Sequence, residues 1–240
     1  FMEKSKKLKI FIGLFYLILL FSFLIIFFSK YSFEEVNSYK FIQQNRDYFF
    51  NLKETNLILI SFLFFIFTII WVFFAGFGSP VALISGFIFG KFLGTFVVVL
   101  GLTFGASFLY IFANYFLKNF IKEKFLFKFQ NLESKFKKHE FNYFLLYRFV
   151  GGIPFAIANL LPVMFNISIK NYFLGTFLGI TPQLFLMASL GSGLNKIVQQ
   201  NETVPLISDL LLSSEIYIPI SAFIFIVLIT IFIRKFFYKN

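Results

Sequence analysis

The 240-residue chain contains no cysteine and only one histidine, His139. Without cysteine it can form neither a disulfide bond nor a thiolate metal site, and it has no thiol nucleophile. One histidine leaves too few ligands for a histidine metal centre, and none of the predicted spans contains a pair of carboxylates. We therefore expect no metal, no cofactor and no enzymatic activity.

Charged residues are the second shortage. They make up 14% of the chain, against 59% hydrophobic residues, whereas about a quarter of the residues of a soluble domain are charged. Lipid must therefore solvate most of the chain, and the sequence predicts an integral membrane protein. The net charge of +11 fits basic cytoplasmic flanks and contact with anionic lipid headgroups better than it fits nucleic acid, which we do not expect as a partner.

Long apolar segments are abundant. A membrane span needs about 20 predominantly apolar residues. Five segments qualify, namely residues 8–29, 57–77, 92–117, 168–192 and 216–237. Two further apolar stretches, near 78–90 and 148–165, are broken by glycine and proline, which is typical of re-entrant segments.

The predicted fold is an all-α polytopic membrane protein with about five to six transmembrane helices and two re-entrant segments. Basic residues at both ends and in the middle of the chain all favour the cytoplasmic side. Five crossings cannot place both ends there, so the orientation of the termini stays open.

The two broken stretches lie at corresponding places in two similar halves. Residues 78–117 and residues 148–192 each contain a broken segment with a proline, followed by a glycine-rich span. Paired interrupted segments of this kind point to an inverted repeat with a transport site at its interface. We divide the chain into an anchor helix with a polar loop (1–56), a membrane core (57–195), and an acidic loop with a last helix (196–240).

A basic segment connects the two halves. In residues 118–141, apolar side chains recur every three or four positions among seven lysines and three glutamates. This pattern predicts an amphipathic helix that lies in the headgroup plane and faces anionic lipid. The alternative is an ordinary solvated connecting helix.

Small residues and prolines predict where helices pack closely or break. Glycines spaced four residues apart allow two helix backbones to approach in a lipid environment, and proline interrupts a helix. The residues assigned to these two functions are Pro80, Gly86, Gly90, Gly94, Gly101, Gly105, Pro162, Gly175, Gly179 and Pro182.

Arg148 lies in the second broken stretch. A charge at membrane depth costs about 3 kcal/mol on insertion scales, so it normally faces a cavity or a partner. The predicted spans contain no Asp or Glu, and a guanidinium group suits a phosphate. The predicted lipid-phosphate site consists of Arg148, Gly151, Gly152, Pro154, Asn159 and Gln183. The alternative places Arg148 near the interface, with its side chain reaching water.

Five stretches carry a resemblance to a known family. They are PVALISGFIFGKFLGTF (80–96), GLTFGASFLYIFANYF (101–116), YRFVGGIPFAIAN (147–159), NYFLGTFLGITPQLF (171–185) and LGSG (190–193). Together they resemble the DedA superfamily over roughly residues 57–195, and most closely its SNARE-associated Golgi protein branch, which carries the VTT domain.

The resemblance implies two re-entrant segments in an inverted repeat and a function in moving lipids between leaflets. It implies phospholipid scrambling as in eukaryotic relatives, or recycling of undecaprenyl phosphate or phospholipid as in bacterial ones. The family signature falls on Arg148, Pro154, Phe155 and Asn159, and its first re-entrant motif on Pro80, Gly86, Gly90 and Gly94. The chain lacks the membrane-embedded acidic residues of proton-coupled members and a second signature arginine, and Pro162 stands where glycine is common.

The leading hypothesis is a lipid translocase or scramblase that moves phospholipid or undecaprenyl phosphate across a bacterial plasma membrane as a multi-pass protein. Its partners would be anionic or phosphate-bearing membrane lipids, with a homo-oligomer left open. One alternative is a secondary transporter of a small anion or ion. The other is a non-transporting scaffold that uses the helix at 118–141.

Overall fold

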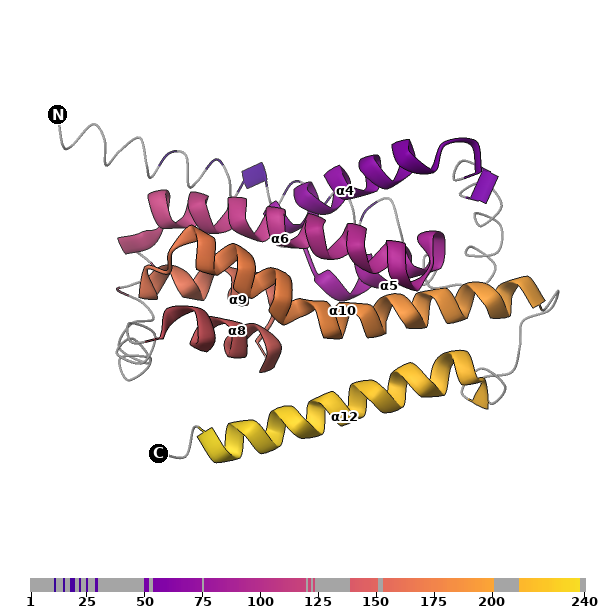
Figure 1. Cartoon of the computed structure of the whole chain (residues 1–240). Coiled ribbons are helices and arrows are strands. Elements are labelled where there is room, and N and C mark those ends of the chain that lie inside the picture. The colour runs from indigo at the N-terminus through magenta and orange to yellow at the C-terminus, as the bar shows by residue number, and fades with distance from the viewer. Residues whose placement is uncertain are drawn as a thin grey trace.

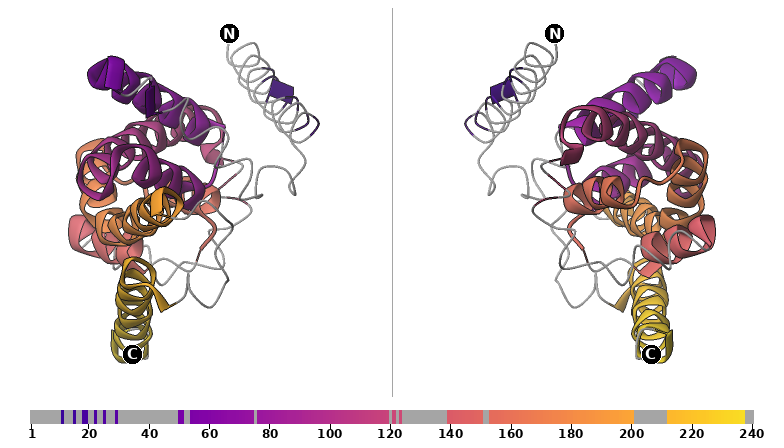
Figure 2. Two further views of the ribbon diagram at one scale, coloured as in Figure 1. Left: turned by 90° about the vertical axis from the view of Figure 1, so that its right-hand side faces the viewer. Right: turned by 90° about the vertical axis from the view of Figure 1, so that its left-hand side faces the viewer.

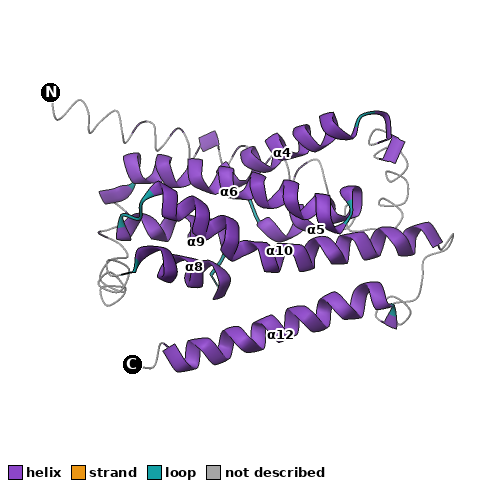
Figure 3. Ribbon diagram, viewed as in Figure 1, coloured by secondary structure: helices purple, strands orange, loops and turns teal. Residues whose placement is uncertain are grey.

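The computed structural model describes residues 54–74, 76–119, 139–150, 153–200 and 212–237, with isolated positions 11, 15, 18, 19, 22, 25, 29, 50, 51, 121 and 123. All regular structure in these ranges is helical, and they contain no strand (Figure 1, Figure 3). The prediction of an all-α protein is confirmed. Most of the predicted anchor helix (8–29) and most of the predicted amphipathic helix (118–141) lie outside the described residues.

The first half of the core consists of α4 (Leu57–Phe73), α5 (Gly78–Phe89) and α6 (Lys91–Phe116). α4 begins after Asn56, whose side chain accepts a hydrogen bond from the Leu59 amide at 3.0 Å, as expected of an N-cap. The helix ends at Phe73, although the next residues are still apolar, so it is shorter than the span predicted at 57–77.

The second half consists of α8 (Glu140–Val150), α9 (Phe155–Leu160), the 3-10 helix η1 (Leu161–Phe165) and α10 (Ile169–Gln200), and α12 (Ser214–Phe237) follows it. α8 begins before residue 148, so the second broken stretch includes a longer helix than the sequence predicted. α10 continues past the predicted end at 192, because the polar residues that follow are compatible with a helix.

The two halves share one plan. In each, a helix is followed by a short segment, a joint with positive φ, and a long helix. The joints are Gly90 (φ 81°) and Asn166 (φ 56°), which are the residues with positive φ in the described ranges. Glycine and asparagine are the residues that adopt this backbone region most readily, so the sequence marks both joints.

The glycine pairs of the two long helices have matching surroundings. A Cβ on Gly105 of α6 would lie 2.9 Å from Val72 Cβ of α4, and a Cβ on Gly179 of α10 would lie 2.5 Å from Arg148 Cβ of α8. The other glycine of each pair, Gly101 or Gly175, packs in the same way one turn earlier. Each long helix thus docks on the helix that precedes its broken segment, and Val72 is the first-half counterpart of Arg148.

α10 is the central helix of the bundle and packs on α5, α6, α8 and α12. α4 lies at one edge against α6, and α12 lies at the opposite edge (Figure 1, Figure 2). At the α5–α10 contact, Gly86 faces the Ala188 backbone and Gly191 faces the Leu83 carbonyl. Neither position has room for a side chain.

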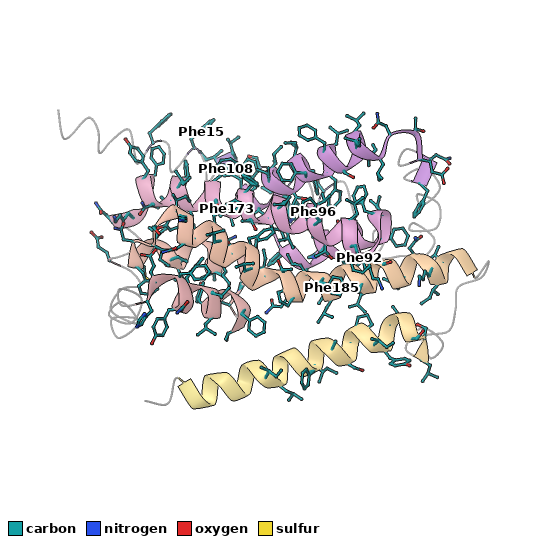
Figure 4. The ribbon with its side chains drawn as sticks, viewed as in Figure 1. Phe15, Phe92, Phe96, Phe108, Phe173 and Phe185 are labelled. Atoms are coloured by element: carbon teal, nitrogen blue, oxygen red, sulfur yellow. The ribbon has the colours of Figure 1, made fainter. Side chains whose placement is uncertain are left out.

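Two described helices are long and apolar enough to cross a membrane, α6 and the part of α10 from Ile169 to Val198. The outside of the bundle is apolar as well. On α6, Phe92, Phe96 and Phe108 are 71%, 58% and 48% exposed (Figure 4). An apolar exterior of this kind suits lipid. The total number of spans and the re-entrant course of the broken segments stay predictions.

Candidate functional site

Arg148 lies in the last turn of α8 and is only 4% exposed. The carbonyl end of a helix carries about half a negative charge and therefore favours a cation there. α10 approaches closely at this level because Gly179 has no side chain to hold it away. The structure thus places the predicted arginine inside the bundle, and its side chain does not reach the surface.

Neutral groups hold the guanidinium. Nη1 donates to Asn159 Oδ1 at 2.8 Å and Nη2 donates to Tyr172 Oη at 2.7 Å. The Tyr172 hydroxyl in turn donates to the Asn159 carbonyl at 3.1 Å. No described carboxylate pairs with Arg148, and its Nε is buried without a hydrogen-bond partner. The positive charge therefore has no counter-ion among the described residues.

Aromatic rings surround the same group. The guanidinium carbon lies 5.1 Å from the ring centres of Phe144 and Tyr172, and 6.0 Å from that of Phe155. Cation–π contacts of this kind stabilise a buried cation by about 2 kcal/mol. They fix the plane of the guanidinium without neutralising its charge.

A cavity of about 240 Å³ opens beside Arg148. Its walls come from the start of α5, the end of α8, α9 and the middle of α10. The lining residues are Phe77, Gly78, Ser79, Tyr147, Arg148, Ile153, Phe155, Ala158, Ile180, Gln183, Leu184 and Met187. The cavity therefore lies where the broken segments of the two halves meet.

Comparison with known proteins agrees with this architecture. Residues 77–193 match the VTT domain. The match confirms the resemblance predicted from the sequence, and it begins and ends within the core predicted at 57–195.

Proteins similar to this chain include transmembrane proteins of animals. Transmembrane protein 41B of Mus musculus is 28% identical over 127 residues, which cover 51% of this chain and 43% of the relative. The Gallus gallus protein is 28% identical over 142 residues, which cover 56% of this chain and 52% of the relative. The Transmembrane protein 41 homolog of Caenorhabditis elegans is 26% identical over 136 residues, which cover 54% of this chain and 55% of the relative. The chain thus spans about half the length of these relatives, and no solved structure matches it. With its apolar helices, these similarities identify a membrane protein.

The helical bundle brings three of the six predicted binding residues together. Arg148 and Gln183 line the cavity, and Asn159 is buried behind it. Gln183 Nε2 donates to the Phe149 carbonyl at 2.6 Å, so its amide is already engaged at the end of α8. Pro154 is exposed ahead of α9 and does not line the cavity. Gly151 and Gly152 lie outside the described residues.

Several residues of the site were not predicted. Tyr172 belongs to a chain with 11 tyrosines, and nothing in its position along the sequence separates it from the others. Phe77, Gly78 and Ser79 form the cavity wall that the first half contributes. A signal for that wall was present in the sequence, because Gly-Ser-Pro opens a short helix at the place that corresponds to the arginine-bearing break.

The remaining predicted packing residues have various surroundings. A Cβ on Gly94 of α6 would lie 2.6 Å from the Ser85 carbonyl of α5. Pro80 is exposed in the first turn of α5, and Pro162 is buried in η1. Pro182 lies inside α10 and removes one amide donor from the helix next to the cavity.

A second polar cluster joins α8 to α10. Glu140 Oε1 accepts hydrogen bonds from the Ser168 amide at 2.8 Å, from Ser168 Oγ at 2.7 Å and from Asn171 Nδ2 at 2.8 Å. Burial acts to raise the pKa of Glu140, but the hydrogen bonds from Ser168 and Asn171 outweigh it and lower this pKa below its usual value. The carboxylate lies at the amino end of α10, where the helix dipole favours an anion.

Proposed function

We propose that the chain is a lipid translocase of the scramblase type, which moves a phosphate-bearing lipid between leaflets. The lipid is a phospholipid or undecaprenyl phosphate. The membrane is the plasma membrane of a bacterium, and the partners are anionic or phosphate-bearing lipids. Transport in this proposal breaks no covalent bond, so the protein acts as a translocase and not as an enzyme.

The uncompensated charge of Arg148 carries the proposal. An isolated buried cation costs several kcal/mol, because it leaves water without gaining a counter-ion. Here the guanidinium has two neutral hydrogen-bond partners, a free Nε and a cavity beside it. An anionic headgroup that enters this cavity supplies the missing charge and bonds to the free donor.

The size of the cavity supports transport of the headgroup alone. Pockets for drug-sized ligands measure about 300–1,000 Å³, and this cavity has about 240 Å³. A headgroup fits and a whole lipid does not. The acyl chains therefore stay along the apolar exterior, where residues such as Phe92 and Phe96 are exposed.

The test is lipid exchange in proteoliposomes that contain headgroup-labelled phospholipid or undecaprenyl phosphate. We expect rapid exchange with the wild type, a large loss with Arg148→Ala, and partial recovery with Arg148→Lys, which keeps the charge but not the planar fork. Lys91→Ala is the control, because Lys91 is exposed at the start of α6, and it should exchange lipid like the wild type. If the Arg148 substitutions leave the exchange rate unchanged, the proposed site is refuted. If exchange does not exceed that of empty liposomes, the proposed translocase function is refuted.

The small volume also favours a second candidate, a transporter of a small anion. A phosphate ion needs no more room than this cavity offers. Uptake of radioactive phosphate into the same liposomes distinguishes the two functions. The scaffold hypothesis depends on residues 118–141, most of which lie outside the described ranges.

A further inference from the structure

The first turn of α5 has two backbone amides without a hydrogen-bond partner. Phe77 precedes the helix and offers no side-chain acceptor. No described group accepts from the N–H of Gly78 or Ser79, and both residues line the cavity. Pro80 has no N–H. The amino end of a helix also carries about half a positive charge, so this end of α5 is suited to an anion.

Trp71 fixes the position of that end. Its indole Nε1 donates to the Phe77 carbonyl at 2.9 Å, and the Gly76 amide donates to the Trp71 carbonyl at 2.9 Å. The indole also occupies the place where a side chain at residue 76 would stand. The loop before α5 thus wraps around Trp71, which makes Trp71 a positioning residue for the helix end.

We propose that the amides of Gly78 and Ser79 form the second half of an anion site whose first half is Arg148. The proposal rests on the proposed function and adds a binding element from the other half of the chain. Two independent observations support it. One is the pair of unpartnered amides, and the other is Arg148, which is 4% exposed, lines the same cavity and has a buried Nε without a hydrogen-bond partner.

The charge of the site indicates its ligand. Arg148 contributes one positive charge, and the half positive charge of the α5 end is offset by the half negative charge of the α8 end that carries Arg148. The described residues of the lining include no lysine, histidine, aspartate or glutamate. A phosphate diester carries one negative charge, whereas a monoester carries about 1.5 to 2 near neutral pH. The site therefore binds a singly charged phosphate group, held by the guanidinium on one side and the two amides on the other.

The experiment uses the full chain in detergent and follows the fluorescence of Trp71, the single tryptophan. Dihexanoyl phosphatidylglycerol is the diester probe, and inorganic phosphate is the free anion. We compare Ser79→Pro, which removes an amide in a turn that tolerates proline, with Ser79→Ala, which removes only the hydroxyl. Losing one charge-assisted hydrogen bond should weaken binding about tenfold more in Ser79→Pro than in Ser79→Ala.

Equal affinities in these two variants would overturn the proposal, even if lipid exchange still depended on Arg148. If Ser79→Pro does not fold, Trp71→Phe takes its place. It keeps a ring but loses the donor to Phe77, and calorimetry should then show weaker binding of the diester. Binding without lipid exchange would leave this site intact and refute the translocase. Lipid exchange without binding of either probe would support the translocase and refute this site. Stronger binding of inorganic phosphate than of the diester would overturn the assignment to a diester.

Discussion

At the scale of single residues, Arg148 depends on its neighbours for its direction. Tyr172 bonds to Nη2 and to the Asn159 carbonyl, and its ring stacks on Phe144 and Tyr110 at centre distances of 5.0 and 4.2 Å. The tyrosine is fully buried. The hydroxyl therefore fixes one end of the guanidinium, while Nε is left without a hydrogen-bond partner.

Tyr172→Phe tests this arrangement. The substitution keeps the ring but leaves Nη2 without its partner, so we expect about 1–3 kcal/mol of destabilisation together with slower lipid exchange. The matched control is Tyr110→Phe, because the Tyr110 hydroxyl bonds to the Ile167 carbonyl and not to Arg148. It should lose comparable stability in a detergent unfolding assay. If both variants slow exchange equally per folded molecule, Tyr172 has no special relation to the arginine.

At the scale of helices, the two glycine pairs allow equally close helix packing, but against different neighbours. Gly105 brings α6 against Val72, and Gly179 brings α10 against Arg148. An added methyl group forces the helices apart at either place, which costs about 1–3 kcal/mol. Only the second place lies beside the cavity.

We therefore expect Gly105→Ala and Gly179→Ala to lower the unfolding temperature in detergent to a similar extent. Gly179→Ala should also reduce lipid exchange severalfold, because it displaces the backbone that carries Arg148. Gly105→Ala should exchange lipid at close to the wild-type rate once the amount of folded protein is equal. A severalfold loss of exchange in Gly105→Ala would mean that the halves are not independent.

Helix order could be predicted from the sequence because its breaks have local causes. Gly90 has a positive φ that glycine adopts freely, and the break after α8 coincides with glycine and proline. The end of α4 could not be predicted, since Phe74 and Phe77 are as apolar as the helix, and a hydrogen bond from Trp71 fixes the loop that follows. Tyr172 and the α5 amides are long-range neighbours of Arg148, and spacing along the chain does not show such contacts.

At the scale of the whole molecule, three side chains hold the joint between the second broken segment and α10. Lys118 Nζ donates to Asn166 Oδ1 at 2.6 Å, and the Tyr110 hydroxyl donates to the Ile167 carbonyl. Glu140 accepts from Ser168. Lys118 and Tyr110 come from the first half of the chain or its end, so the joint connects the two halves and fixes where α10 begins.

Protonation of Glu140 should weaken this joint. The pKa of Glu140 is lowered in the folded chain from its usual 4.5, so folding favours the carboxylate. Its contribution to stability is complete above the unfolded-state pKa and is lost as the pH falls through the lower, folded-state pKa.

Glu140→Gln should therefore unfold at a lower temperature than the wild type at pH 7, and the difference should shrink as the pH falls below about 4.5. The effect is modest because solvent screens a partly exposed carboxylate. Glu54→Gln, which neutralises an exposed residue ahead of α4, is the control, and a difference that stays constant from pH 7 to well below the unfolded-state pKa would show that the Glu140 charge does not hold the joint.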